Sequence, residues 1–165
     1  MRVRIEHRPA FHVTGLRARV SPMSGTIPAL WQAFVPRLDE IRPVNEPGVS
    51  YGVMADFDPV AGQLDYMAAV STPPEAAAPA GMLGWALPGG HFAVFSTCLA
   101  DLGDAFGHIF GAWRAQVGEA LLRAPYWERY GLDFSPDQPR SPVEIWMPVN
   151  EAFAQAAAQA SDGRL

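Results

Sequence analysis

The chain has 165 residues, of which 49% are hydrophobic and 18% charged, and its net charge at pH 7 is −5. This balance is typical of one globular domain and argues against an intrinsically disordered chain. The acidic charge also argues against direct binding of nucleic acid or of an anionic membrane, because either partner needs a basic patch on the protein.

Cys98 is the single cysteine, so neither a disulfide nor a cysteine-based metal site is expected. The four histidines show no ligand spacing, and we therefore predict no metal and no cofactor. The amino terminus lacks an apolar signal segment, and no run of eighteen apolar residues occurs. These features predict a cytoplasmic protein.

The first half of the chain predicts two strands, a helix and a hairpin. Residues 2–8 and 11–20 have strand character and are separated by Pro9. A helix beginning near Thr26 should be kinked or divided at Pro36. One face of this helix is apolar and comprises Ile27, Leu30, Trp31, Phe34, Leu38 and Ile41. Residues 49–57 and 63–72 then predict a hairpin, because the intervening residues have turn chemistry.

The second half repeats this order after a connector. Residues 73–90 are rich in proline, alanine and glycine and are predicted to form that connector. A strand at 91–97 precedes a helix over 99–122, whose apolar stripe comprises Leu102, Phe106, Ile109, Phe110, Trp113, Val117 and Leu121. Glycines at 103, 107 and 111 indicate close approach of this helix to a sheet. Residues 127–134 and 143–149 predict a second hairpin, and the alanine-rich end is either a terminal helix or a tail.

Together these elements predict a single domain over residues 1–150, followed by an alanine-rich tail over 151–165. A weak internal repeat accompanies the duplicated order: Tyr51 and Tyr130 each stand in a Tyr-Gly pair, and each is followed fourteen positions later by an acid, Asp65 or Glu144. The repeat predicts a pseudo-twofold arrangement of the two halves.

Glu144 is the unusual residue of the closing strand, because an ionised side chain in an apolar run needs a partner. Alternation places Glu144 and Trp146 on the same face, opposite Val143 and Ile145. A carboxylate beside an indole could line a hollow for a flat, positively charged ligand. The alternative is that Trp146 covers the sheet edge while Glu144 faces water.

Four segments, GTIPALWQAF, LPGGHFAVFS, WERY and VEIWMPV, occur in an order and spacing that resemble the GyrI-like small-molecule-binding family. This family is related to the effector-binding domains of multidrug-responsive regulators of the AraC and MerR types. The resemblance implies an α+β fold with two layers. In it, two strand-helix-hairpin units form an antiparallel sheet with helices on one face and a ligand cleft between the repeats.

The resemblance also implies which residues line that cleft. The acid and aromatic of the closing strand correspond to Glu144 and Trp146, and those of the preceding strand to Glu128 and Tyr130. The remaining candidates for the wall are Tyr51, Tyr66 and Trp85. The tyrosines could equally be core residues, and Trp85 could equally anchor its loop.

Two functions share this expected cleft. The first is a stand-alone cytosolic protein that binds a small hydrophobic ligand, cationic or neutral, as a sensor or a sequestering module. It would have no DNA-binding helix-turn-helix of its own, and any regulation would need a possible protein partner. The alternative is a hydrolase of cyclopropane-bearing or similar electrophilic compounds, in which a desolvated Glu144 acts as general acid or base. The sequence leaves open whether the chain is an enzyme.

Overall fold

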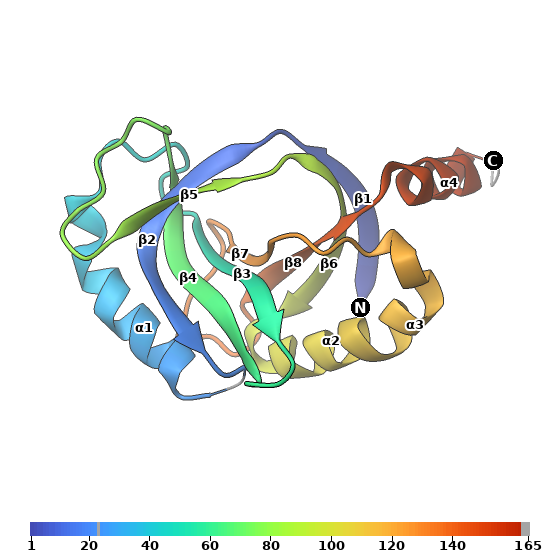
Figure 1. Ribbon diagram of the computed structural model, residues 1–165, viewed down its shortest axis with the longest axis horizontal. Coiled ribbons are helices and arrows are strands. Elements are labelled where there is room, and N and C mark those ends of the chain that lie inside the picture. Colours follow the sequence, from blue (N-terminus) through green and yellow to red (C-terminus); the bar gives the residue numbers. More distant parts are fainter. Residues whose placement is uncertain (23, 163–165) are drawn as a thin grey trace.

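The computed structural model describes residues 1–22 and 24–162, and this part of the chain shows an α+β fold with an eight-stranded antiparallel sheet and four α-helices, of which α2 and α3 are continuous through a π turn (Figure 1). The strand order in the sheet is β1-β6-β8-β7-β3-β4-β2-β5. In chain order the strands are β1 (Arg2–Arg8), β2 (Phe11–Val20), β3 (Ser50–Asp58), β4 (Gln63–Thr72), β5 (Leu83–Leu87), β6 (Gly90–Cys98), β7 (Tyr126–Tyr130) and β8 (Pro142–Val149).

The predicted duplication of strand, helix and hairpin is confirmed. The first unit is β2, α1, β3 and β4, and the second is β6, α2, β7 and β8. The units meet at the antiparallel pair of β3 and β7, where Gly52 lies opposite Glu128. The residue-level repeat is wrong, because Tyr51 belongs to the inner core whereas Tyr130 lies on the face that the helices cover.

The edge strands are exchanged between the two units, and this exchange curls the sheet. β1 pairs with β6, and β2 pairs with β5. The register is the same in both pairs, so β1 followed by β2 runs antiparallel to β5 followed by β6 as one long two-stranded ribbon. The ribbon bends where Pro9 and Ala10 pass Gly89, at which a Cβ atom would lie 2.4 Å from the Ala10 nitrogen. Residues 73–90 are therefore more than the predicted connector. They contain β5, a strand of only five residues that is flanked in the sequence by prolines and glycines.

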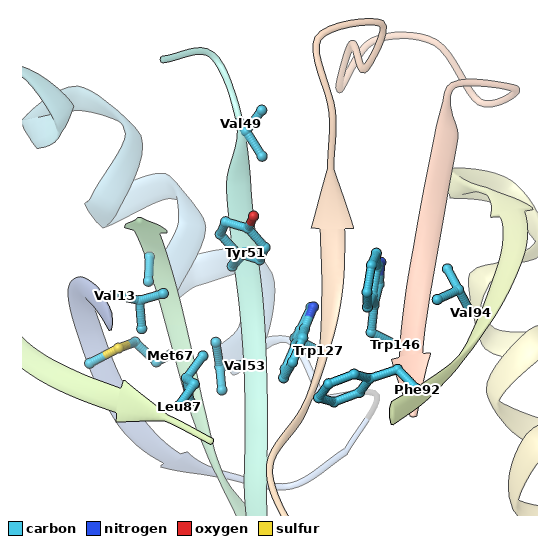
Figure 2. Packing of buried hydrophobic residues seen from close by; sticks show 11 residues of the cluster. Val13, Val49, Tyr51, Val53, Met67, Leu87, Phe92, Val94, Trp127 and Trp146 are labelled. Carbon is cyan, nitrogen blue, oxygen red and sulfur yellow. The ribbon is translucent and has the colours of Figure 1, made fainter. Parts of the chain in front are cut away.

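The curled sheet encloses an inner core on the face away from the helices. Side chains from seven strands meet there, and Figure 2 shows Trp127 and Trp146 side by side within it. The buried members of this cluster are Val13, Val49, Tyr51, Val53, Met67, Ala69, Leu87, Phe92, Val94, Trp127 and Trp146. β2 and β6 are far apart in the strand order, and a flat sheet could not bring their side chains into one cluster. The shared cluster therefore shows that the sheet is strongly curved.

Helices cover the outer face of the sheet. α1 (Thr26–Phe34) ends before a 3-10 turn (Val35–Glu40) that contains Pro36, as predicted, and its apolar stripe packs on β4. α2 (Leu102–His108) continues through a π turn (Ile109–Trp113) into α3 (Arg114–Val117). The predicted close approach is wrong at Gly107 and Gly111, because both are exposed and face open space.

The carboxyl-terminal segment forms helix α4 (Glu151–Asp162). The side-chain oxygen of Asn150 accepts a hydrogen bond from the backbone N–H of Phe153 at 2.9 Å, which caps the first turn. The ring of Phe153 packs edge-on against Trp113. Within the described part of the chain, no helix combines the length and the apolar character that crossing a membrane requires.

Candidate functional site

The seven residues predicted to line one cleft lie on two opposite faces of the sheet. Successive side chains of a strand alternate between its faces, so Glu128 and Tyr130 of β7 project towards the helices together with Tyr66 of β4. The remaining four lie on the inner side or at its edge: Tyr51, Trp85, Glu144 and Trp146. The two glutamates therefore cannot act in a single site.

Glu128 is a buried carboxyl on the helix-covered face, with 5% of its surface exposed. Its Oε2 atom accepts hydrogen bonds from the hydroxyls of Tyr66 at 2.9 Å and Tyr130 at 2.7 Å. Burial raises the pKa of Glu128 to about 7, although the two phenolic donors act in the opposite direction. Near neutral pH this carboxyl is therefore divided between its neutral and ionised forms.

Trp31 of α1 completes the surroundings of Glu128. Its indole N–H donates to the Tyr66 hydroxyl at 2.8 Å, and its ring meets Tyr130 edge-on with centroids 5.3 Å apart. The ring of Phe134, in the loop after β7, also contacts Tyr130, with ring centroids 4.6 Å apart. Trp31 belongs to the predicted apolar face of this helix but is not among the seven predicted site residues. A polar N–H on an otherwise apolar stripe was the available signal.

Gly52 makes room for this arrangement at the junction of the two units. A Cβ atom there would lie 2.2 Å from the Tyr66 hydroxyl oxygen and 2.4 Å from Oε2 of Glu128. The carboxyl and the phenol therefore occupy the space of a missing side chain.

Aromatic side chains of the second unit flank the same carboxyl. Tyr126 of β7 lies two positions before Glu128, and its ring meets Phe106 and Phe110 of the α2 helix region at 6.5 and 5.5 Å between centroids. Burial and the nearby Glu128 raise the pKa of Tyr126 to about 12, so this phenol remains neutral. Aromatic rings from both helix regions thus contact the tyrosines that neighbour one ionisable carboxyl, and such a combination suits an aromatic or apolar cation.

Glu144 has a different environment, which explains its place in an apolar strand. Arg4 donates to Oε1 of Glu144 at 2.6 Å, the Trp146 indole N–H donates to Oε2 at 3.1 Å, and Arg129 approaches within 3.7 Å. Trp146 is only 8% exposed and stacks on Trp127 in the inner core. The carboxylate is neutralised by the protein itself, and the indole is used in packing.

Tyr51 and Trp85 also pack with arginines. The Tyr51 hydroxyl donates to Glu46 and accepts from Arg8 at 2.9 Å. The Trp85 ring lies beneath the guanidinium of Arg17, 4.1 Å from its carbon to the ring centroid. Both side chains therefore belong to the inner face and its edge, away from Glu128.

The fold is that of a GyrI-like effector-binding domain. Residues 4–149 match the Cass2 family, described as integron-associated effector binding protein, and the chain belongs to that family.

The chain is similar in sequence to a known regulator and in structure to several solved proteins. The transcriptional regulator BrlR of Pseudomonas aeruginosa is 31% identical over 152 residues, which cover 90% of this chain and 56% of the regulator. The chain thus spans about half the length of that relative.

Two solved structures share the fold. SAV2435 bound to tetraphenylphosphonium has a TM-score of 0.68 and 15% identity, with 92% of this chain and 96% of that one covered. The Vibrio cholerae integron cassette protein has a TM-score of 0.63 and 19% identity, with 90% and 95% covered.

Proposed function

We propose that this protein binds hydrophobic cations on the helix-covered face of its sheet, with Glu128 as the counter-charge. The observation that carries the proposal is the lack of a basic partner for Glu128 among the described residues, where its hydrogen-bond partners are tyrosine hydroxyls. In contrast, Asp65 and Glu144 each pair with two arginines. Glu128 is thus a buried acid whose charge no basic side chain of the described residues compensates.

The energetics favour a ligand whose positive charge is spread over an apolar body. Such a cation loses little hydration when it leaves water, and in a desolvated site it gains both the carboxylate and the faces of aromatic rings. Trp31, Tyr66 and Tyr130 supply those rings. For a compact, strongly hydrated cation, the free energy of hydration that is lost would exceed the free energy gained from the same contacts.

Entry to the site requires side chains to move, because Glu128 and Tyr130 are buried. Tyr130 contacts the rings of both Trp31 and Phe134, and Phe134 lies in the loop between β7 and β8. We infer that an entering ligand displaces the Tyr130 ring and takes over its contacts with Trp31. The tetraphenylphosphonium held by SAV2435, a protein of the same fold, supports a hydrophobic cation as the ligand class.

A titration with tetraphenylphosphonium at two pH values tests this proposal. The cation binds the ionised carboxylate, and Glu128 has a pKa of about 7. The ionised fraction therefore rises about tenfold between pH 6 and pH 8, and the affinity is expected to rise by the same factor. Isothermal titration calorimetry in buffers of different ionisation enthalpy measures both the affinity and the proton released. Absence of binding, or equal affinity at both pH values without proton release, would contradict the proposal.

We further propose that binding serves to sense or to sequester such compounds. The similarity to a transcriptional regulator supports sensing. Sequestration needs only the affinity itself, and a protein partner would be required only for the sensing role. Gel filtration of the wild-type protein with and without tetraphenylphosphonium distinguishes the two, since sensing requires a change that a partner can detect.

The raised pKa of Glu128 also favours a second candidate, hydrolysis of an electrophilic ligand in the same site. A carboxyl with a pKa of about 7 can take up and release a proton at neutral pH, as a general acid or base must. Tyr66 and Tyr130 would then orient it. Mass spectrometry after incubation with cyclopropane-bearing compounds separates the candidates. Product that disappears in Glu128→Gln supports an enzyme, and bound ligand without product supports a binding protein.

A further inference from the structure

A groove of about 650 Å³ lies between helix α4 and the edge strand β1, away from Glu128. Figure 1 shows α4 beside β1, on the opposite side of the molecule from α1. One wall of the groove is formed by α4, which lies beyond residues 4–149 of the family match. The volume falls within the range of roughly 300–1,000 Å³ that small-molecule sites occupy.

Most of the groove is apolar. Ile5 of β1, Ala93 of β6 and Trp113 line the side formed by the sheet and the α2–α3 helix. The facing wall consists of small side chains of α4 and one aromatic ring: Ala154, Ala157, Ala158 and Phe153. Alanines on this face leave open the space that larger residues would fill, so the groove can take an extended hydrocarbon.

Two imidazoles supply hydrogen-bonding groups in this apolar groove. His7 and His91 lie opposite each other in the β1–β6 pair, and their rings meet edge-on with centroids 5.1 Å apart. Both residues line the groove. Each ring can offer an N–H donor, and two donors this close can share the oxygens of one carboxylate.

The remaining charges of the groove do not favour a cation. Arg4 and Glu6 also line it and pair with each other at 2.8 Å, and Arg4 donates to Glu144 of β8 as well. Among the described residues of the groove, the one acid is thus Glu6, which is half-exposed and lies beside an arginine, unlike the buried Glu128. We propose that this groove is a second binding site, which takes an amphiphilic carboxylate: the hydrocarbon lies along α4 and the carboxylate on His7 and His91.

Calorimetric titration with decanoate, decanol and decyltrimethylammonium, all below their micelle concentrations, tests the proposal. Decanoate is expected to bind at least tenfold more tightly than the ammonium amphiphile. The double variant His7→Leu/His91→Leu should lose at least tenfold in decanoate affinity, the equivalent of one charge-assisted hydrogen bond, and should bind decanol unchanged. Equal binding of the anionic and cationic amphiphiles, or no binding of decanoate, would overturn the assignment.

Substitutions on α4 locate the site without disturbing the core. Ala158 is exposed and lines the groove, so Ala158→Trp is expected to fill it and abolish decanoate binding. Ala156→Trp is the matched control, because Ala156 is exposed on the same helix but does not line the groove. Glu128→Gln should leave decanoate binding intact, which separates this site from the proposed cation site. Decanoate binding that survives Ala158→Trp, or that is lost in Glu128→Gln, would refute the groove as the site.

Discussion

Glu128→Gln is expected to weaken the binding of tetraphenylphosphonium at pH 8 by at least thirtyfold. The substitution preserves the shape of the side chain and an oxygen that Tyr66 and Tyr130 can donate to, but it removes the charge. Removing one partner of a desolvated charge pair costs roughly 2–5 kcal/mol of binding free energy, and about 1.4 kcal/mol corresponds to a factor of ten. The remaining affinity should no longer depend on pH between 6 and 8.

Glu144→Gln is the matched control, because Glu144 is the other glutamate of the closing hairpin and faces away from the helices. Arg4 and Arg129 already neutralise it. Its substitution should leave the affinity for tetraphenylphosphonium within about twofold, since exposed and half-exposed ion pairs contribute little. If Glu144→Gln abolished binding while Glu128→Gln did not, the ligand would occupy the inner face and the proposed site would be wrong.

Glu128→Gln should also change how the free energy of unfolding depends on pH. Burial raises the pKa of Glu128 from 4.5 to about 7, so between these values the folded protein holds a proton that the unfolded chain has lost. The free energy of unfolding therefore falls as pH rises through this range, by up to about 3 kcal/mol. Glu128→Gln removes the effect, and urea denaturation should find the variant more stable than wild type at pH 8 but similar at pH 4.5. Parallel pH profiles for the two proteins would contradict this assignment of the pKa.

Periodicity predicted most of the fold because the core imposes it on the sequence. The stripe from Ile27 to Ile41 packs on the sheet as expected, and Pro36 ends α1 because it cannot donate to the helix. β5 could not be predicted in the same way. Its five residues lie among turn formers, and only pairing with β2 makes them a strand. The glycines of the α2 region show that a local pattern can also mislead. Their spacing indicated close packing on the sheet, but the space around Gly107 and Gly111 is open.

The sequence could indicate which residues belong to a candidate site, but not which face of the sheet they occupy or how each acid is ionised. Alternation along each strand correctly grouped Glu128 with Tyr130, and Glu144 with Trp146. Which face of the sheet the helices cover is set by long-range packing of α1 and the α2–α3 region on the strands, and this packing has no local signature in the sequence. The ionisation of each acid depends on arginines that are distant in the chain: Arg4 reaches Glu144 from 140 positions away, and no such partner reaches Glu128 among the described residues.

Gly52→Ala is expected to destabilise the protein by roughly 2–6 kcal/mol, from overpacking and a lost buried hydrogen bond together, and to abolish cation binding. The added methyl group would lie 2.2 Å from the Tyr66 hydroxyl oxygen and 2.4 Å from Oε2 of Glu128, and no real contact is that short. At least one of these groups must move. Either movement breaks the hydrogen bond between them and leaves a buried polar group unsatisfied. Urea denaturation and a tetraphenylphosphonium titration measure the two effects.

A second glycine and a double variant show whether the cause is this contact. Gly107→Ala introduces the same methyl group on an exposed helix face with open space around it, and it should be neutral or stabilising by up to about 1 kcal/mol. Tyr66→Phe removes the oxygen nearest to the new methyl group. Gly52→Ala/Tyr66→Phe should therefore lose less stability than the sum of the two single substitutions, because the clash and the lost hydrogen bond involve the same hydroxyl. Strict additivity would mean that Gly52 acts through the backbone of β3 and that the carboxyl and the phenol do not depend on the space it leaves.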